Sequence, residues 1–398
     1  MTKKLLHTPE GVRDIYETEC ERKMALEANM MSVMELYAYH PIQTPMFEFF
    51  DIFAREIGST PSKDLYKFFD REGNTLVLRP DITPSIARCA SKYYMDETLP
   101  LRFSYKGNTF VNNSSLQGRL KEYTQCGAEL IGDGSADADA EIIALGVHLL
   151  EKAGLREFQI SVGHADYLSG LFEAAGFCEE TEAEITDRLR NKNFFGVLDI
   201  IANIPMDEDI RSLFSLVAEY AVTPDMIREA RKKAAGYPKV LASLERIEAL
   251  NEILKIYKVD RYVSYEFGML PELTYYTGII FAGYTFGTGE PIIKGGRYDH
   301  LLQYFGKESP ATGFAVVVNQ LMSALSRQEI PIPYKSRNTW IVYDETHRRY
   351  ALETAETIRT GGEPVKMILL QSEDQISDVE RSAAEKSVEN VIYMLGER

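Results

Sequence analysis

Two segments of alternating apolar and polar residues, separated by a polar loop, restrict the possible folds of this chain more than any other pattern. The first runs from Arg102 to Val111 and the second from Leu120 to Gly132, with the loop NNSSLQGR between them. A period of two is typical of strands that bury one face, and consecutive strands joined by a loop commonly pair in antiparallel fashion. We therefore expect an antiparallel pair with a long loop.

Other segments predict that more strands and helices surround this pair. A hairpin with the turn REGN is expected over Lys67–Pro80, and an extended edge segment over His40–Phe50. Apolar residues recur at helical spacing over Glu17–Tyr37, which places Met24, Leu26, Met30 and Met34 in the core. Further strands are expected at 158–164, 261–268, 275–286 and 290–296, and further helices near Pro84, at 133–154 and at 316–327.

The domain organisation follows from two changes in pattern. From about 165 to 258 the periodicity is helical throughout, which predicts a helical insertion in an α+β core spanning residues 1–330. The proline-containing segment PIPYKSR at 331–337 is typical of a linker. Beyond it, residues 338–398 alternate as strand, helix, strand, helix, strand, which predicts a small α/β domain.

Composition and charge exclude several classes of protein. The chain has 44 Lys and Arg against 60 Asp and Glu, a net charge of −16, which argues against broad electrostatic capture of nucleic acid. We find no apolar run long enough to cross a membrane and expect a cytoplasmic protein. Four cysteines without a CxxC pair are expected to be buried thiols, not disulfides or zinc ligands: Cys20, Cys89, Cys126 and Cys178.

Common cofactor and metal motifs are missing from the sequence. There is no GxxxxGK[ST] phosphate loop, no GxGxxG fingerprint, no HExxH and no GxSxG. The six histidines do not fall at ligand spacing from one another or from the cysteines. We therefore expect neither a cofactor nor a metal site.

Six motifs in order give the chain a family resemblance. They are TPEGVRDI from Thr8, LRPDITP from Leu78, GR…EYTQCGAELIG from Gly118, YYTG from Tyr275, GGRYDHLL from Gly295 and PATGFA ending at Ala315. In this order they resemble the catalytic core of histidyl-tRNA synthetase. The resemblance implies a class II synthetase-like fold, with a mostly antiparallel sheet flanked by helices and a self-dimer formed through the Pro45 segment. The C-terminal domain resembles a shortened anticodon-binding domain.

Three arginines that the synthetase family uses are replaced here. The family's second motif has Phe-Arg-x-Glu, whereas this chain has Phe110 followed by Val111. The third motif carries a Glu-Arg pair where this chain has Asn319 and Gln320, and the arginine four residues before the YYTG tyrosines is Pro271. If each loss costs about 3 kcal/mol of transition-state stabilisation, adenylate formation falls about a million-fold.

The amino-acid half of the pocket is retained by resemblance. Asp81 and Thr83 match the residues that receive the α-ammonium group, and Gln125 and Glu129 match residues that contact bound histidine. Tyr275 and Tyr276 are expected at the imidazole ring, whose two nitrogens a carboxylate and a phenol satisfy. Arg119 is a candidate for the carboxylate anchor that Pro271 has removed.

The resemblance leaves several functions open. A family relative on the same scaffold is the noncatalytic regulatory subunit of ATP phosphoribosyltransferase, which joins a short catalytic subunit in a hetero-oligomer and senses L-histidine. This is the expected function. The alternatives are a divergent histidyl-tRNA synthetase and a synthetase-like module for RNA sensing.

Overall fold

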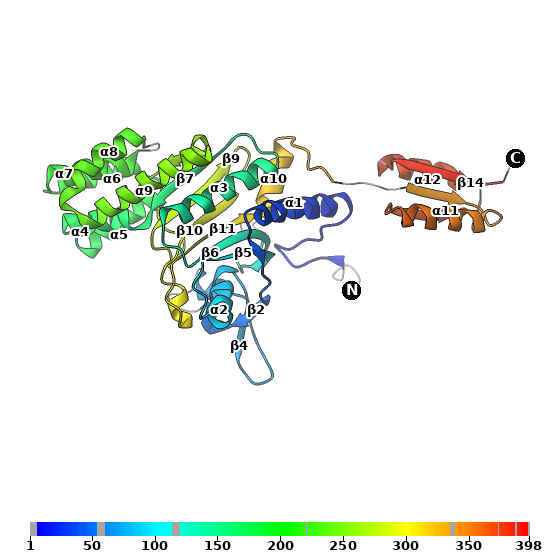
Figure 1. Cartoon of the computed structure of the whole chain (residues 1–398), viewed down its shortest axis with the longest axis horizontal. Coiled ribbons are helices and arrows are strands. Elements are labelled where there is room, and N and C mark those ends of the chain that lie inside the picture. Colours follow the sequence, from blue (N-terminus) through cyan, green and yellow to red (C-terminus); the bar gives the residue numbers. More distant parts are fainter. Residues whose placement is uncertain are drawn as a thin grey trace. The chain divides into compact units, whose positions relative to one another are not determined.

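The structure of the chain is a computed structural model (Figure 1). It describes residues 6–53, 60–113, 120–219, 222–334, 339–372, 374–386 and 388–396. These residues form two compact units, Met1–Ile332 and Pro333–Arg398.

The first unit is built on an eight-stranded sheet. Its strand order is β1-β5-β6-β11-β10-β9-β7-β8. All neighbouring pairs are antiparallel except β1 with β5 and β7 with β8, which are parallel pairs at the two edges. The strands are β1 (His40–Pro41), β5 (Leu101–Phe110), β6 (Glu122–Ile131), β7 (Phe158–His164), β8 (Val263–Tyr265), β9 (Ile279–Thr285), β10 (Ile293–Arg297) and β11 (Ala311–Val317).

One face of this sheet carries the main hydrophobic core. It packs against α1 (Glu17–Leu36), α3 (Ala136–Lys152) and α10 (Val318–Arg327), which contact β5, β6 and β11 (Figure 1). Helix α3 begins at Ala136, within the range expected from the sequence, and the Ser135 hydroxyl caps its first turn by accepting a hydrogen bond from the Ala138 N–H. The opposite face is left for α2 and for the cavity described below.

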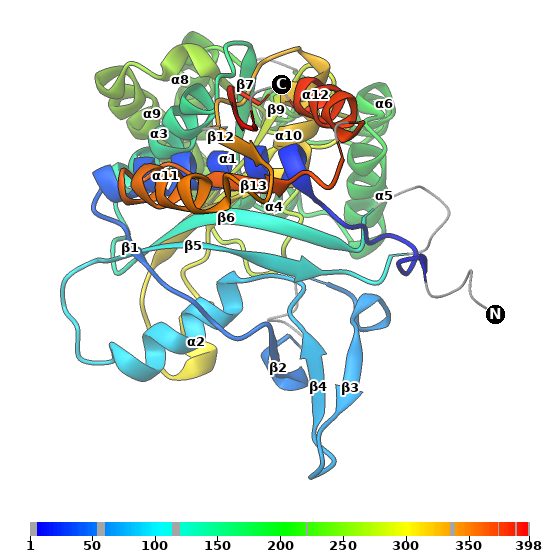
Figure 2. The same cartoon turned by 90° about the vertical axis from the view of Figure 1, so that its right-hand side faces the viewer.

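A second, smaller sheet and a short helix lie near β5. The sheet contains β2 (Phe47–Phe49), β4 (Thr75–Leu78) and β3 (Lys67–Phe69) in that order, all antiparallel. Figure 2 shows β5 and β6 side by side, with the β3–β4 hairpin extending away from them. Helix α2 (Thr83–Tyr93) follows β4 directly, with Pro84 in its first turn. Both the hairpin and this helix agree with the sequence prediction.

The helical insertion gathers beside β7 and β9 (green in Figure 1). Helix α9 lies against both α3 and α4, and it also contacts β7. The helices of the insertion are α4 (Ala165–Ala175), α5 (Glu179–Arg190), α6 (Phe194–Asn203), α7 (Glu208–Ser215), α8 (Pro224–Lys233) and α9 (Pro238–Tyr257).

A buried ionic cluster joins α9 to the sheet. The Asp139 carboxylate on α3 accepts hydrogen bonds from the Arg297 Nε of β10 at 2.9 Å and from the Arg246 Nε of α9 at 2.8 Å. Asp139 and Arg297 are almost fully buried, at 1% and 4% exposure. Burying one carboxylate between two guanidinium groups ties three elements that lie far apart in the sequence.

Three sequence predictions are corrected by the structure. Met24 is 63% exposed, because it lies on the outer side of α1, whereas Leu26, Met30 and Met34 are buried as expected. Cys178 is exposed, and Cys20 and Cys89 are only partly buried, so Cys126 alone is a buried thiol. Strand β11 has no counterpart in the predicted elements, because most of its residues are buried and its sequence shows no alternation.

The second unit is a small α/β domain with a three-stranded sheet and two helices. A parallel sheet in the order β13-β12-β14 contains β12 (Thr339–Tyr343), β13 (Val365–Leu369) and β14 (Asn390–Met394). Two separate apolar clusters form around it, one with α11 (Arg348–Thr360) and one with α12 (Gln375–Glu385). The alternation of strand and helix agrees with the sequence.

Two types of feature are missing from the described ranges. None of their helices combines the length and the apolar character that a bilayer span needs. The same residues contain no cluster of three or more His, Cys, Asp or Glu side chains arranged to hold a metal ion.

Candidate functional site

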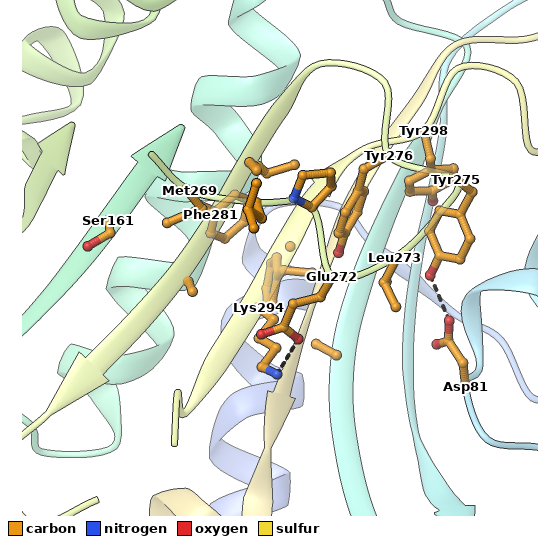
Figure 3. A pocket seen from close by; sticks show the side chains of 18 of the residues that line it. Asp81, Ser161, Met269, Glu272, Leu273, Tyr275, Tyr276, Phe281, Lys294 and Tyr298 are labelled. Carbon is orange, nitrogen blue, oxygen red and sulfur yellow. Dashed lines mark hydrogen bonds and ion pairs between the residues drawn. The ribbon is translucent and has the colours of Figure 1, made fainter. Parts of the chain in front are cut away.

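A large cavity opens on the sheet face opposite the main core. Its volume is about 860 Å³, and its floor is formed by β6, β11, β10 and β9. Figure 3 shows the tyrosines and acidic residues that line it. Six of the seven residues predicted from the sequence line this cavity: Asp81, Thr83, Gln125, Glu129, Tyr275 and Tyr276. The seventh, Arg119, lies outside the described residues.

Glu129 is the most deeply buried acid in the cavity. It is 1% exposed, and its Oε1 accepts a hydrogen bond of 2.7 Å from the Thr83 hydroxyl. The Tyr298 hydroxyl donates to Oε2. Gly313 lies opposite Glu129 on β11, and a Cβ at Gly313 would overlap the Glu129 carboxylate. The absence of a side chain at Gly313 therefore leaves the space that the Glu129 carboxylate occupies.

Burial also changes the acidity of Glu129. Desolvation raises the pKa of Glu129 from its ordinary 4.5 to about 8, against the opposing effect of the hydrogen bonds from Tyr298 and Thr83. A ligand that brings a positive charge or an N–H donor would favour the ionised carboxylate. Binding of such a ligand and ionisation of Glu129 are therefore coupled.

This shift predicts a pH dependence of stability. Because the folded pKa lies above the unfolded value, the stabilisation is complete below about pH 4.5 and is lost as the pH rises through about 8. Relative to Glu129→Gln, the unfolding free energy of the ligand-free wild type should fall by on the order of 4 kcal/mol between about pH 5 and pH 8.5. Urea denaturation of both proteins across this range measures the difference, and parallel curves would contradict the buried-acid assignment.

A second acidic group, Asp81, lies two residues before the start of α2. Asp81 Oδ2 accepts a hydrogen bond of 2.6 Å from the Tyr275 hydroxyl, and Oδ1 accepts one of 3.3 Å from the Thr83 N–H. Burial raises the pKa of the Asp81 carboxyl, and the hydrogen bond from Tyr275 opposes that effect. Arg79, two residues earlier, does not face a ligand. Its guanidinium donates to the carbonyl oxygens of Thr44 and Asn108 and so positions this turn.

Three tyrosines form an aromatic wall. The Tyr275 ring meets the rings of Tyr276 and Tyr298 edge to face, at centroid distances of 5.4 and 5.8 Å. The Tyr276 ring lies directly over Gly296, where a Cβ would come within 2.8 Å of it. Burial raises the pKa of all three hydroxyls well above 10, so they stay protonated and can donate hydrogen bonds.

Gln125 carries an unsatisfied acceptor. It lies on β6, four residues before Glu129 and on the same face of the strand. Its Oε1 is buried and has no hydrogen-bond partner. Leaving a buried polar atom unpaired costs about 1–3 kcal/mol, and a ligand N–H at the cavity wall would recover that energy.

The positions of the three replaced arginines carry no positive charge. The N–H of Val111 donates to the Lys121 carbonyl oxygen, and Gln320 on α10 donates to Glu290 at 3.3 Å. Pro271 lines the cavity itself. These three side chains therefore offer the cavity no charged group for a phosphate.

Several cavity residues were not predicted from the sequence, among them Tyr298, Lys294 and Glu272. Tyr298 is the second donor to Glu129, and Lys294 of β10 forms an ion pair of 2.5 Å with Glu272 in the segment before β9. Tyr298 lies within the GGRYD motif, so that motif already contained the signal. Lys294 could have been placed by alternation, since it lies two residues before Gly296 on the same strand.

Comparisons with known proteins agree with this geometry. The sequence profile of the histidyl-tRNA synthetase family matches residues 11–321. An ATP phosphoribosyltransferase regulatory subunit of Ruminiclostridium cellulolyticum is 37% identical over 394 residues, which cover 99% of this chain and 93% of that protein. One from Acetivibrio thermocellus is 38% identical, over 91% of this chain and 86% of that protein.

Solved structures give the same picture. A Bacillus halodurans protein described as an ATP phosphoribosyltransferase regulatory subunit/histidyl-tRNA synthetase superimposes with a TM-score of 0.86 at 31% identity, covering 99% of both chains. Histidyl-tRNA synthetase from Nostoc superimposes with a TM-score of 0.81 at 17% identity, covering 98% of this chain and 92% of that one, which shows the shared fold alone. The class II synthetase-like α+β fold expected from the sequence is confirmed.

Proposed function

Because this chain belongs to the family of ATP phosphoribosyltransferase regulatory subunits, we propose that it activates a short catalytic phosphoribosyltransferase chain and makes it sensitive to L-histidine. The chain is noncatalytic by itself and serves the first step of histidine biosynthesis. The observation that carries this function is the asymmetry of the cavity. Six of the residues expected to bind the amino acid line it, whereas Val111, Gln320 and Pro271 stand where a synthetase has arginines.

Histidine suits the residues in the amino-acid half of the cavity. An imidazole ring has one donor and one acceptor when neutral, and two donors when protonated. Glu129 supplies an acceptor, and Tyr276 supplies a ring face and a hydroxyl. Asp81, Thr83 and the unpaired Gln125 oxygen are placed to receive an α-ammonium group. This assignment gives each of these five residues a partner on the ligand.

Regulation requires only that histidine binds one state of the complex better than another. A ligand shifts an equilibrium between two states by its difference in affinity for them. Ionisation of Glu129 on binding would change the charge of the cavity. Tyr298, which donates a hydrogen bond to Glu129, directly follows Arg297 of the buried Asp139 cluster in the chain. The site and the body of the sheet are thus physically connected.

An exposed apolar surface on the small sheet supports a self-dimer. Pro45 leads into β2, and the side chains around it are unusually exposed for their size. Met46 and Phe49 are each 56% exposed, Phe47 is 52% exposed and Phe69 on β3 is 72% exposed. A patch of this kind commonly marks a protein interface. We propose that a second copy of the chain binds this surface. We also propose that the protein binds neither nucleic acid nor a membrane and that it is located in the cytoplasm.

The C-terminal unit has a proposed role in contacts with other chains. Its sheet and two helices resemble a shortened anticodon-binding domain, and its described strands present few aromatic side chains for stacking bases. We propose that it packs against a partner protein and does not read RNA.

Co-purification tests the proposed function directly. The chain should form a complex with a short catalytic subunit, and phosphoribosyl-ATP formation from ATP and phosphoribosyl pyrophosphate should require both proteins. Histidine should inhibit the complex. The isolated chain should show no histidine-dependent ATP–pyrophosphate exchange. Such exchange, or aminoacylation of tRNA, would instead identify an active synthetase.

A further inference from the structure

The proposed histidine site leaves one ligand group without a partner. The carboxylate of an amino acid needs a cation or several hydrogen-bond donors, and Pro271 can supply neither. Among the described residues that line the cavity, three carry positive charge. Arg190 and Lys192 are exposed at the corner between α5 and α6, whereas Lys294 comes from the cavity floor.

The strand register places Lys294 on the same face of the sheet as Glu129. Glu129 pairs with Gly313 on β11, and Gly313 pairs with Gly296 on β10. Lys294 lies two residues from Gly296, so its side chain points to the same side. Glu129 and Lys294 are separated by two strand spacings across the sheet and by two residues along the strand. Their Cα atoms are therefore roughly 12 Å apart.

The space between these two charged groups suits a small zwitterion. The Tyr276 ring covers Gly296, which lies in the same cross-strand row as Glu129 and two residues from Lys294. In Figure 3, Tyr276 stands between the Glu272–Lys294 pair and the Tyr275–Asp81 pair. A ligand whose imidazole lies against Tyr276 and Glu129 would therefore extend its other end toward either pair.

The Lys294–Glu272 ion pair is of a kind that a ligand can replace. Its Nζ to Oε2 distance is 2.5 Å, but the side chains are 41% and 61% exposed. Exposed pairs of this type contribute little to stability, so exchanging the Glu272 carboxylate for a ligand carboxylate has a small cost. The lysine keeps a partner in both states, and Glu272 holds it at the cavity when no ligand is bound.

We propose that Lys294 binds the carboxylate of the amino-acid effector, in place of an arginine at position 271. Glu272 is the exchangeable partner that this carboxylate displaces. The cavity is thereby specific for an α-amino acid over the corresponding neutral amide. This inference rests on the proposed function, because it concerns how the same site distinguishes its ligand.

Calorimetric titration with L-histidine and L-histidinamide separates the possibilities. Histidinamide keeps the ring and the α-amino group but has no negative charge. Wild type should prefer histidine, and Lys294→Met should weaken histidine binding about tenfold to a hundredfold while leaving histidinamide binding unchanged. Lys239→Met is the matched control, since Lys239 is 43% exposed and pairs with Asp166 outside the cavity.

A second variant should bind histidine more tightly, a result that a loss of folding could not produce. Glu272→Gln removes the competing carboxylate and should tighten histidine binding roughly twofold to fivefold, with no change for histidinamide. If Lys294→Met weakened the binding of histidine and of histidinamide equally, the lysine would have a structural role and the inference would be overturned. So would unchanged histidine affinity in Lys294→Met. If wild type binds no histidine, the proposed effector itself is wrong and the assignment of Lys294 fails with it.

Discussion

Glu129→Gln should weaken histidine inhibition of the assembled complex by about tenfold to a hundredfold. The substitution keeps the shape of the side chain but removes the charged acceptor, and a hydrogen bond to a charged group contributes about 1.5–3 kcal/mol. Glu129 lies within the described cavity at 1% exposure, so water cannot replace the lost interaction. The histidine concentration that halves phosphoribosyl-ATP formation is the measurement.

The same experiment distinguishes ligand sensing from activation. Activity of the complex without histidine should stay close to that of wild type, because Glu129 makes its hydrogen bonds within the cavity, to Thr83 and Tyr298. Glu173→Gln provides the control, since it makes the same change in charge at an exposed position of α4. Unchanged inhibition in Glu129→Gln would place the histidine site elsewhere, on the partner or at an interface.

Asp139→Ala should lower the unfolding free energy by about 3–5 kcal/mol. The change removes the carboxylate that Arg297 and Arg246 share, and a buried guanidinium without its partner is strongly destabilising. Arg297 keeps a contact with Asp299 at 3.0 Å, which limits the loss. Urea denaturation followed by circular dichroism at neutral pH measures the change.

A neighbouring residue on the same helix gives the comparison for Asp139. Asp137 is exposed in the first turn of α3, where its charge interacts with the helix dipole, so Asp137→Ala should cost less than about 1 kcal/mol. Similar losses in the two variants would mean that the buried cluster contributes no more than a surface charge.

Local patterns in the sequence determined much of this fold. Alternation placed Gln125 and Glu129 on one strand face, and the helical periodicity of 165–258 predicted the insertion that the structure contains. Asp81 and Thr83 were found through the motif that surrounds them. Each of these inferences used residues close together in the chain, for which period and spacing are informative.

Other features depend on contacts that no local pattern records. The hydrogen bond from Tyr298 to Glu129 joins residues 169 positions apart, and it exists because β10 and β6 both pair with β11. Strand β11 was missed because a strand buried on both faces loses its alternation. Met24 was assigned to the core because helical spacing alone does not say how wide the buried stripe of α1 is.

The Asp139 cluster also limits how the chain can be divided for engineering. Arg246 lies inside the insertion, so excising α4 to α9 would remove one of the two guanidinium groups from a carboxylate that is buried in the remaining core. The same cut would expose the apolar surfaces of α3 and β7 that α9 covers. Amide hydrogens in α9 should therefore exchange together with those of β10, at the rate at which the whole first unit opens. The insertion is a continuation of the core and not a detachable module.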